Sequence, residues 1–246
     1  MQTERRRETR HTSDPGWRRL GVAAAATMAT WSVALQVVAG TVIPPVAAVG
    51  IAFALLATLV GRMTRTWVAV AAAVIPLLAL AGNLPPIVHD LSHPEEAVVF
   101  TLTVVSVVGA LLTSLAGFML WFRRGGSATP AAVVGTGAVV VSAIVGFVAS
   151  SGVESAEAAA GDVVVETRSV QFAPTEIVFT IDATGVWVDN ADPFPHTFTI
   201  EGTGIDLGVP GYSAQRVDVD LDPGTYLVIC AVPGHEAMTA TLVVEG

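Results

Sequence analysis

The stretch Thr225-Tyr-Leu-Val-Ile-Cys230-Ala-Val-Pro-Gly-His235-Glu-Ala-Met238 decides how the C-terminal part of this chain folds. Residues 225–230 are rich in β-branched and aromatic side chains, which predicts a buried β-strand. The Pro-Gly pair that follows predicts a turn. We therefore expect His235 and Met238 to fold back toward the sulfur of Cys230, at the end of that strand.

Cys230 is the only cysteine in the chain, so a disulfide within the chain is impossible. Taken one at a time, these residues have ordinary explanations, since a single cysteine or methionine is usually core filler. Together with His196 they supply one thiolate, two imidazoles and one thioether, which is the donor set of a mononuclear blue-copper site. His196 lies far earlier in the chain and would come from another strand. The sequence thus predicts a copper site formed by His196, Cys230, His235 and Met238.

Residues 162–246 resemble a cupredoxin, the plastocyanin and azurin family of small blue copper proteins. The matching segments are residues 170–177, 188–198 and 221–226, together with the Cys230 loop. The resemblance implies an all-β Greek-key sandwich that binds one type 1 copper ion and transfers electrons without being an enzyme. It implies three equatorial ligands and one weak axial ligand, which are His196, Cys230, His235 and the axial Met238.

One departure from the family pattern lies in the loop, because only Glu236 and Ala237 separate His235 from Met238. Many relatives have a longer approach to the axial sulfur. The family resemblance also implies that His235 is the port through which electrons pass, within an apolar patch. The residues expected around it are Phe194, Pro195, Val232, Pro233 and Ala237.

Two further residues are expected to hold the ligands in place. Thr197, directly after His196, is placed to fix the strand beside the thiolate, and Asn190 is placed to lock the preceding loop by hydrogen bonds. Ordinary turn or strand chemistry is the alternative for both. Short β-type runs are expected at 163–168, 175–181, 185–189, 196–200, 214–220, 225–230 and 239–245.

The first 150 residues are of a different class. Hydrophobic residues make up 52% of the whole chain and charged residues only 13%, which is too apolar for an ordinary soluble domain. Each apolar run approaches the roughly 20 residues that cross a hydrocarbon core. The sequence predicts an all-α membrane region at 20–150, with five spans at about 20–40, 43–61, 67–84, 97–122 and 131–150.

The arginines predict the orientation. All 12 basic residues are arginine, and ten of them fall on one side if the N-terminal tail, residues 1–19, is cytoplasmic. Five spans then place the C-terminal domain outside the cytoplasm. Residues 151–161 are small and polar, so they predict a flexible linker.

The expected outer domain is acidic. Residues 150–246 hold 15 acids and two arginines, a net charge of −13. Such a surface fits a redox partner with a basic docking surface, although for the charge alone a solubilising role is the favoured interpretation. Nothing indicates nucleic-acid binding.

Three functions remain open at this point. The first is a membrane-anchored copper electron carrier, the second a chaperone or storage module that delivers copper to a membrane oxidase, and the third an interaction subunit with a purely structural β domain. A separate pair, His89 and His93, is placed to share one helical face and could bind metal, but a solvated polar loop is the favoured interpretation.

Overall fold

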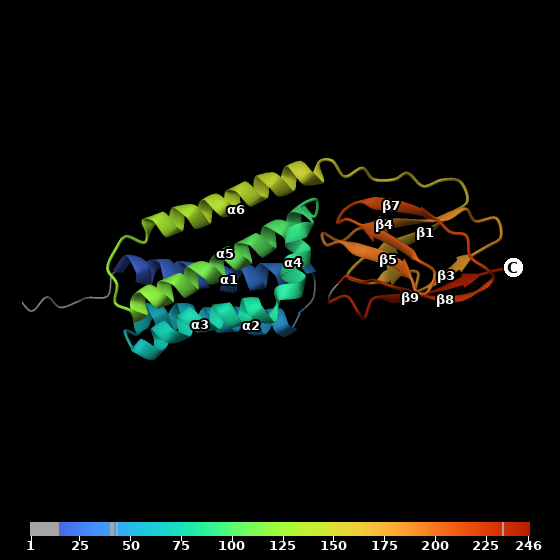
Figure 1. The fold of residues 1–246 in the computed structure, drawn as a ribbon. Helices are drawn as coiled ribbons and strands as arrows, with labels where there is room; N and C mark the ends of the chain where they lie inside the picture. The colour runs from blue at the N-terminus through green and yellow to red at the C-terminus, as the bar shows by residue number, and fades with distance from the viewer. Residues whose placement is uncertain (1–14, 40–41, 43, 233) are drawn as a thin grey trace, which may run out of the picture. The chain divides into compact units, whose positions relative to one another are not determined.

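The computed structural model describes residues 15–39, 42, 44–232 and 234–246. The expectations for Arg5, Arg6, Arg7, Arg10 and Pro233 lie outside these residues. The chain divides into two compact units, one of residues 1–36, 42–84 and 105–140 and the other of residues 37–41, 85–104 and 141–246. The helices and the β domain are therefore described one at a time (Figure 1).

Four described helices are long and apolar enough to cross a membrane, which supports the predicted membrane region. A fifth crossing requires α3 and α4 to count as one span, although the two helices are bent by 70° relative to each other. The described helices are α1 (Pro15–Ala39), α2 (Pro44–Arg62), α3 (Thr66–Gly82), α4 (Leu84–Ser92), α5 (Ala97–Trp121) and α6 (Thr129–Ser150).

The prediction of five spans is corrected to four or five, and the difference lies in the predicted third span, 67–84. Its helix, α3, has 17 residues, so it extends only about 26 Å, less than the roughly 30 Å of a hydrocarbon core. The physical reason lies in the sequence Gly82-Asn-Leu-Pro-Pro86, since glycine and proline interrupt a continuous helix.

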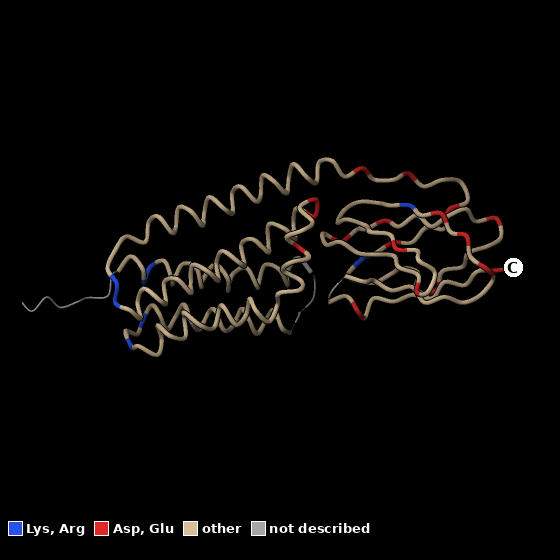
Figure 2. Tube along the Cα trace, in the orientation of Figure 1, with Lys and Arg blue, Asp and Glu red and all other residues tan. Residues whose placement is uncertain are grey.

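Small residues allow the helices to approach one another. A Cβ atom built on Gly117 of α5 would overlap the backbone of Ala72 and Ala73 in α3, and one built on Gly21 of α1 would lie 3.1 Å from the Cβ of Ala116. Close approach through small residues is typical of helices packed in a membrane. The described arginines of this region gather where α1 and α3 begin and α2 and α5 end (Figure 2).

The β domain contains two mixed sheets. One sheet has the strand order β2-β1-β4-β7 and the other has the order β3-β9-β8-β5-β6. The pairs β1/β4 and β3/β9 are parallel, and the remaining pairs are antiparallel. The described strands are β1 (Asp162–Thr167), β2 (Phe172–Ala173), β3 (Glu176–Phe179), β4 (Gly185–Asn190), β5 (His196–Ile200), β6 (Ile205–Val209), β7 (Ala214–Asp218), β8 (Gly224–Ile229) and β9 (Thr239–Val244).

One apolar core lies between the two sheets. Val186 and Val188 of β4 belong to the same buried cluster as Phe198 of β5 and Leu242 of β9. Burial alternates along β5, as the period-two pattern of a strand requires. All seven predicted strands are present. The two that were not predicted are the short β2 and the glycine-containing β6, whose sequence Ile-Asp-Leu-Gly-Val has weak β propensity.

The predicted linker is partly bound to the β domain. The Ala156 N–H donates to the carbonyl of Ala214 at 2.8 Å, and the Trp187 indole N–H donates to the carbonyl of Ala156 at 2.7 Å. Ser155 accepts from the Ala214 N–H at 3.2 Å. Residues 154–156 of the predicted linker are thus hydrogen-bonded to the β domain, whereas residues 151–153 lie between them and the end of α6.

Candidate metal centre

The site lies where two neighbouring strands and a loop meet. His196 is the first residue of β5, and Cys230 directly follows the last residue of β8. Because β5 and β8 pair antiparallel through Thr199 and Ile229, the two donors are brought together despite their separation in sequence. His235 belongs to the loop between β8 and β9, which a hydrogen bond from its own N–H to the Val232 carbonyl bends back toward the strand end.

The donor atoms of His196, Cys230 and His235 all lie within 4.8 Å of one another. The Cys230 Sγ atom is 3.8 Å from Nδ1 of His196 and 3.6 Å from Nδ1 of His235. Metal–sulfur and metal–nitrogen bonds of about 2.3 and 2.1 Å, meeting at an angle of 110–120°, would span roughly 3.6–3.8 Å. The spacing therefore fits a first-row transition metal held between these atoms, and the soft thiolate beside two imidazoles fits copper.

Met238, the predicted axial ligand, lies beside this cluster. It is 1% exposed, its N–H donates to the His235 carbonyl at 2.8 Å, and its carbonyl accepts from the Cys230 N–H at 3.1 Å. These two backbone hydrogen bonds close the loop that carries His235. The backbone thus brings Met238 to the site, and its role as a ligand stays a prediction.

Thr197, proposed from the sequence to fix the strand beside the thiolate, contacts the sulfur of Cys230. Its backbone N–H donates to Cys230 Sγ at 3.4 Å, and its hydroxyl oxygen accepts from the Ala231 N–H at 2.7 Å. The first contact stabilises negative charge on sulfur, and the second fixes the backbone directly after the cysteine. Thr197 therefore joins the start of β5 to Cys230 and to the residue that follows it.

Asn190, at the end of β4, organises the loop that precedes His196. Its side-chain amide lies within hydrogen-bond distance of the carbonyls of Phe194, Val209 and Pro210, at 2.8–3.1 Å. Its side-chain oxygen accepts from the Thr167 hydroxyl and the Asp192 N–H, each at 2.9 Å. Asn190 is 1% exposed, so these contacts satisfy a buried amide and tie the loop to its neighbours.

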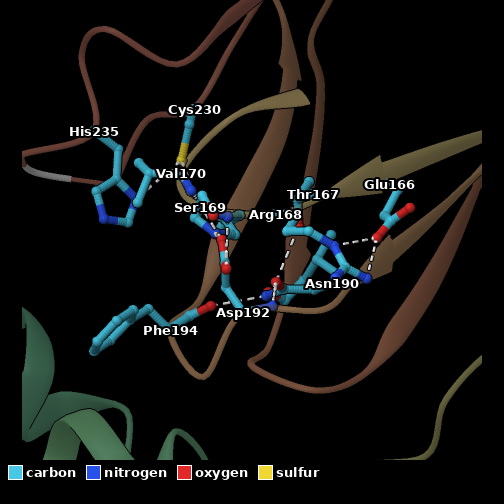
Figure 3. A network of polar contacts seen from close by, with 12 residues as sticks. Glu166, Thr167, Arg168, Ser169, Val170, Asn190, Asp192, Phe194, Cys230 and His235 are labelled. Carbon is cyan, nitrogen blue, oxygen red and sulfur yellow. Dashed lines mark hydrogen bonds and ion pairs between the residues drawn. The ribbon is translucent and has the colours of Figure 1, made fainter. Parts of the chain in front are cut away.

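Asp192 is a site residue that the sequence reasoning missed. Its Oδ2 atom accepts from Nε2 of His196 at 2.9 Å, and its two oxygens also accept from the N–H groups of Ser169 and Val170 at 2.8 and 3.0 Å (Figure 3). Since Nε2 carries the proton in this contact, Nδ1 of His196 is left as the acceptor that faces Cys230. The sequence feature that could have identified Asp192 is an acidic residue four positions before His196, in a loop whose other residues are apolar.

The segment that supports Asp192 is conformationally unusual. Ser169 and Val170 both have left-handed backbone angles, with φ of 54° and 58°. Non-glycine residues rarely adopt this region, and β-branched valine adopts it least readily. Here the conformation turns two successive N–H groups toward one carboxylate, an arrangement that binds anions.

Burial keeps both histidines of the candidate site neutral. It lowers the pKa of His235 to about 4, and the neighbouring His196 adds to this effect. Burial also lowers the pKa of His196, although the hydrogen bond that His196 donates to Asp192 acts in the opposite direction. Burial alone would raise the pKa of Asp192, but hydrogen bonds from Val170, His196 and Ser169 hold it below its usual range. At neutral pH the site therefore presents neutral imidazoles beside an ionised carboxylate.

The two histidines differ in access to solvent. His196 is 1% exposed, whereas His235 is only partly buried, with its ring centroid 4.9 Å from that of His196. Of the apolar residues expected around His235, Pro195 is buried, Phe194 and Val232 are partly buried and Ala237 is exposed.

His89 and His93 form a separate pair in and just after α4. Their rings stack with centroids 4.4 Å apart, and Nδ1 of His93 donates to the His89 carbonyl at 2.8 Å. That hydrogen bond occupies one of the nitrogens that a metal would need. Among the described residues, only His196, Cys230 and His235 form a group of metal-ligating side chains with suitable spacing.

No protein-family model and no curated protein matches the chain. Solved structures similar to it include a heme-copper terminal oxidase dimer, with 22% identity and a TM-score of 0.27, where the match covers 34% of this chain and 60% of that chain. They also include a copper-containing nitrite reductase from Thermus scotoductus SA-01, with 21% identity and a TM-score of 0.29, covering 39% of this chain and 24% of that chain.

Proposed function

We propose that the protein is a membrane-anchored type 1 copper protein that carries single electrons outside the cytoplasm and is not an enzyme. The observation that carries this proposal is the cluster of His196, Cys230 and His235, with both Nδ1 atoms 3.6–3.8 Å from one sulfur. Bound copper would supply the change between Cu(I) and Cu(II).

The chain's own residues would hold the ligands still while the charge changes. Asp192 fixes the ring of His196, and Thr197 donates to the Cys230 sulfur and fixes the backbone directly after Cys230. Asn190 locks the loop that leads from β4 into His196. A donor set held rigidly has little to reorganise when an electron arrives or leaves, so these contacts favour fast transfer.

His235 is the proposed route for the electron, because it is the ligand histidine with access to solvent. The acidic composition of the β domain favours a partner protein with a basic docking surface. The arginine distribution favours a cytoplasmic N-terminus, and a chain with five crossings would then place the copper domain outside.

The direct test is the visible absorption spectrum of the purified, copper-loaded protein. We expect an intense blue thiolate-to-copper band that reductant removes and oxidant restores. Cys230→Ser should abolish the band, because no other cysteine is present. His235→Ala should abolish it as well, whereas the matched variant His93→Ala should keep both the band and one copper per chain.

Other outcomes separate the alternatives. Copper-loaded protein that stays colourless under oxidising conditions would contradict the carrier and favour a copper-delivery module. A protein that binds no copper would favour a structural β domain. Met238→Leu should keep the colour and raise the reduction potential, since a weak axial sulfur donor is lost. An unchanged potential would remove Met238 from the ligand set.

A further inference from the structure

A cavity of about 360 Å³ lies at the arginine-rich end of the helical unit, where α1 and α3 begin and α2 and α5 end. Figure 2 shows the arginines gathered at these helix ends. The residues that line the cavity all belong to one compact unit, so their mutual arrangement is defined. Nothing in the metal centre accounts for this cavity, which we call the arginine cavity.

Three arginines from three different segments line the arginine cavity. Arg18 comes from the first turns of α1, Arg65 precedes α3, and Arg123 follows α5. No hydrogen bond or ion pair joins any of these guanidinium groups to another residue that the structure describes. The described residues of this unit contain no Asp or Glu. Arg18 is half-buried, so a positive charge is partly withdrawn from water without a described counter-charge.

The start of α3 adds uncharged donors to the same cavity. Arg65 occupies the N-cap position without a capping side-chain hydrogen bond, and the first turn contains no acid. The Val68 N–H donates to the Arg65 carbonyl at 3.0 Å, so the N–H groups of Thr66 and Trp67 are the donors that this uncapped helix end offers to an anion. Thr64 and Thr66, on either side of Arg65, also line the cavity and bring two hydroxyl groups to it.

The backbone at Arg123 is a third, independent observation. Arg123 has a left-handed φ of 51° directly beyond the end of α5, at a position where glycine is the usual residue. Glycines are present close by, at 125 and 126, yet an arginine holds the strained position. The strain is retained at the residue whose side chain lines the arginine cavity, as is common at functional sites.

We propose that the arginine cavity binds a phosphate group. Guanidinium groups pair with phosphate oxygens through two parallel hydrogen bonds, and the α3 N–H groups and threonine hydroxyls complete the donor set. A lipid phosphodiester and a free phosphate ion share this chemistry. The exposed Trp67 and Trp121 near the cavity, 51% and 40% exposed, are typical of the membrane interface, where a lipid headgroup would lie. The proposal does not depend on which side of the membrane this end faces.

The test measures the thermal midpoint of the purified full chain in detergent as lipid or salt is added. Phosphatidylglycerol should raise the midpoint, whereas phosphatidylcholine should raise it much less. The double variant Arg65→Gln/Arg123→Gln should bind phosphatidylglycerol at least about tenfold more weakly, because two charge-assisted contacts are lost. The matched double variant Arg62→Gln/Arg124→Gln removes the same charge from the same helix ends but alters no residue that lines the cavity, and it should behave like the wild type.

The possible outcomes distinguish the sources. If millimolar inorganic phosphate alone gives the same rise, and the Arg65/Arg123 variant loses it, the ligand is free phosphate. If both double variants lose the rise equally, the effect is general surface charge and the proposal is overturned. It is also overturned if neither ligand raises the midpoint of the wild type. Arg123→Lys, which keeps the charge, guards against a folding defect and should retain part of the rise.

Discussion

Asp192 illustrates at the scale of one residue how this site controls its histidine. The carboxylate is 8% exposed and makes hydrogen bonds to two backbone N–H groups and to Nε2 of His196. The contact fixes both the proton position and the ring orientation, and it makes the imidazole a stronger electron donor. A stronger donor favours the more highly charged Cu(II).

We therefore predict that Asp192→Asn raises the reduction potential of the copper-loaded protein. A tenfold change in relative affinity for the two copper states corresponds to about 59 mV. Potentiometric titration of the blue band measures this shift. Asp206→Asn removes an exposed acid of the same domain and should leave the potential close to wild type. Equal shifts in the two variants would show only a general effect of charge.

The lowered pKa of His235 predicts how the stability of the metal-free protein depends on pH. Its pKa falls from an ordinary 6.5 to about 4 on folding, so between these values the unfolded chain binds more protons than the folded one. The free energy of unfolding should thus be highest above pH 6.5 and fall steadily as the pH drops toward 4. Thermal midpoints of the metal-free protein across this range measure the slope.

His235→Gln should flatten that slope, while His93→Gln should keep it. A slope in His235→Gln as steep as in the wild type would contradict the assignment of the effect to His235. His196, whose pKa burial also lowers, contributes in the same direction and should account for part of the remaining slope.

The sequence predicts the four candidate donor residues because their chemistry is unusual and three of the four lie in one short stretch, and the structure brings His196, Cys230 and His235 together. Thr197 and Asn190 were proposed as supporting residues because one directly follows His196 and the other precedes its loop. Asp192 could not be assigned in the same way, because its role depends on where the left-handed turn at Ser169 and Val170 meets the histidine loop. This is a tertiary contact between the segment that follows β1 and the loop that follows β4, and no local sequence pattern encodes it.

At the scale of elements, the backbone of Gly211 packs closely against the loop between β4 and β5. A Cβ atom at this position would lie 2.6 Å from the carbonyl oxygen of Pro193 and 3.2 Å from the Phe194 nitrogen. Only glycine therefore allows the β6–β7 connection to approach the loop that contains Asp192 and leads into His196.

We predict that Gly211→Ala pushes this loop away from its position, weakening copper binding and destabilising the β domain by about 1–3 kcal/mol. Copper affinity and the thermal midpoint measure the two effects. Gly208→Ala is the matched control, because a Cβ there meets nothing within 4 Å, and it should retain wild-type affinity. A normal copper affinity in Gly211→Ala would show that the loop tolerates displacement.

The sequence predicts elements well where the hydrophobic pattern is strong. The seven strands with alternating or continuous apolar runs are all present, whereas β6, with Asp206 and Gly208 in its five residues, exists because β5 pairs with it. The predicted third span ends at residue 84, close to where α3 ends, but the expected polar loop that carries His89 is instead the short helix α4, which the two prolines at its start did not suggest.

At the scale of the whole molecule, the number of crossings decides which side of the membrane holds the β domain. An odd number separates the N-terminus from the β domain, and an even number puts them together. The bent pair α3 and α4 makes the difference between four and five. With five crossings, the described arginines of the helical region share one side, which is the arrangement that the positive-inside rule favours.

Single-cysteine labelling tests this prediction, since Cys230→Ser leaves a chain without cysteine. In intact cells, an impermeant maleimide should label Glu201→Cys in the β domain and Ser92→Cys at the end of α4. Ser127→Cys, between α5 and α6, should react only after the membrane is permeabilised. Labelling of Ser127→Cys but not Glu201→Cys in intact cells would reverse the proposed orientation.

The hydrogen-bonded linker residues, 154–156, also affect how readily one β domain can pair with another. β7 lies at the edge of its sheet, where an open strand can pair with the same edge of another molecule and begin aggregation. Residues 154–156 contact this edge through Ala214 and Gln215, so part of it is already occupied. The segment that joins the β domain to the membrane helices thereby protects the domain from edge-to-edge association, a risk that confinement to a membrane surface increases.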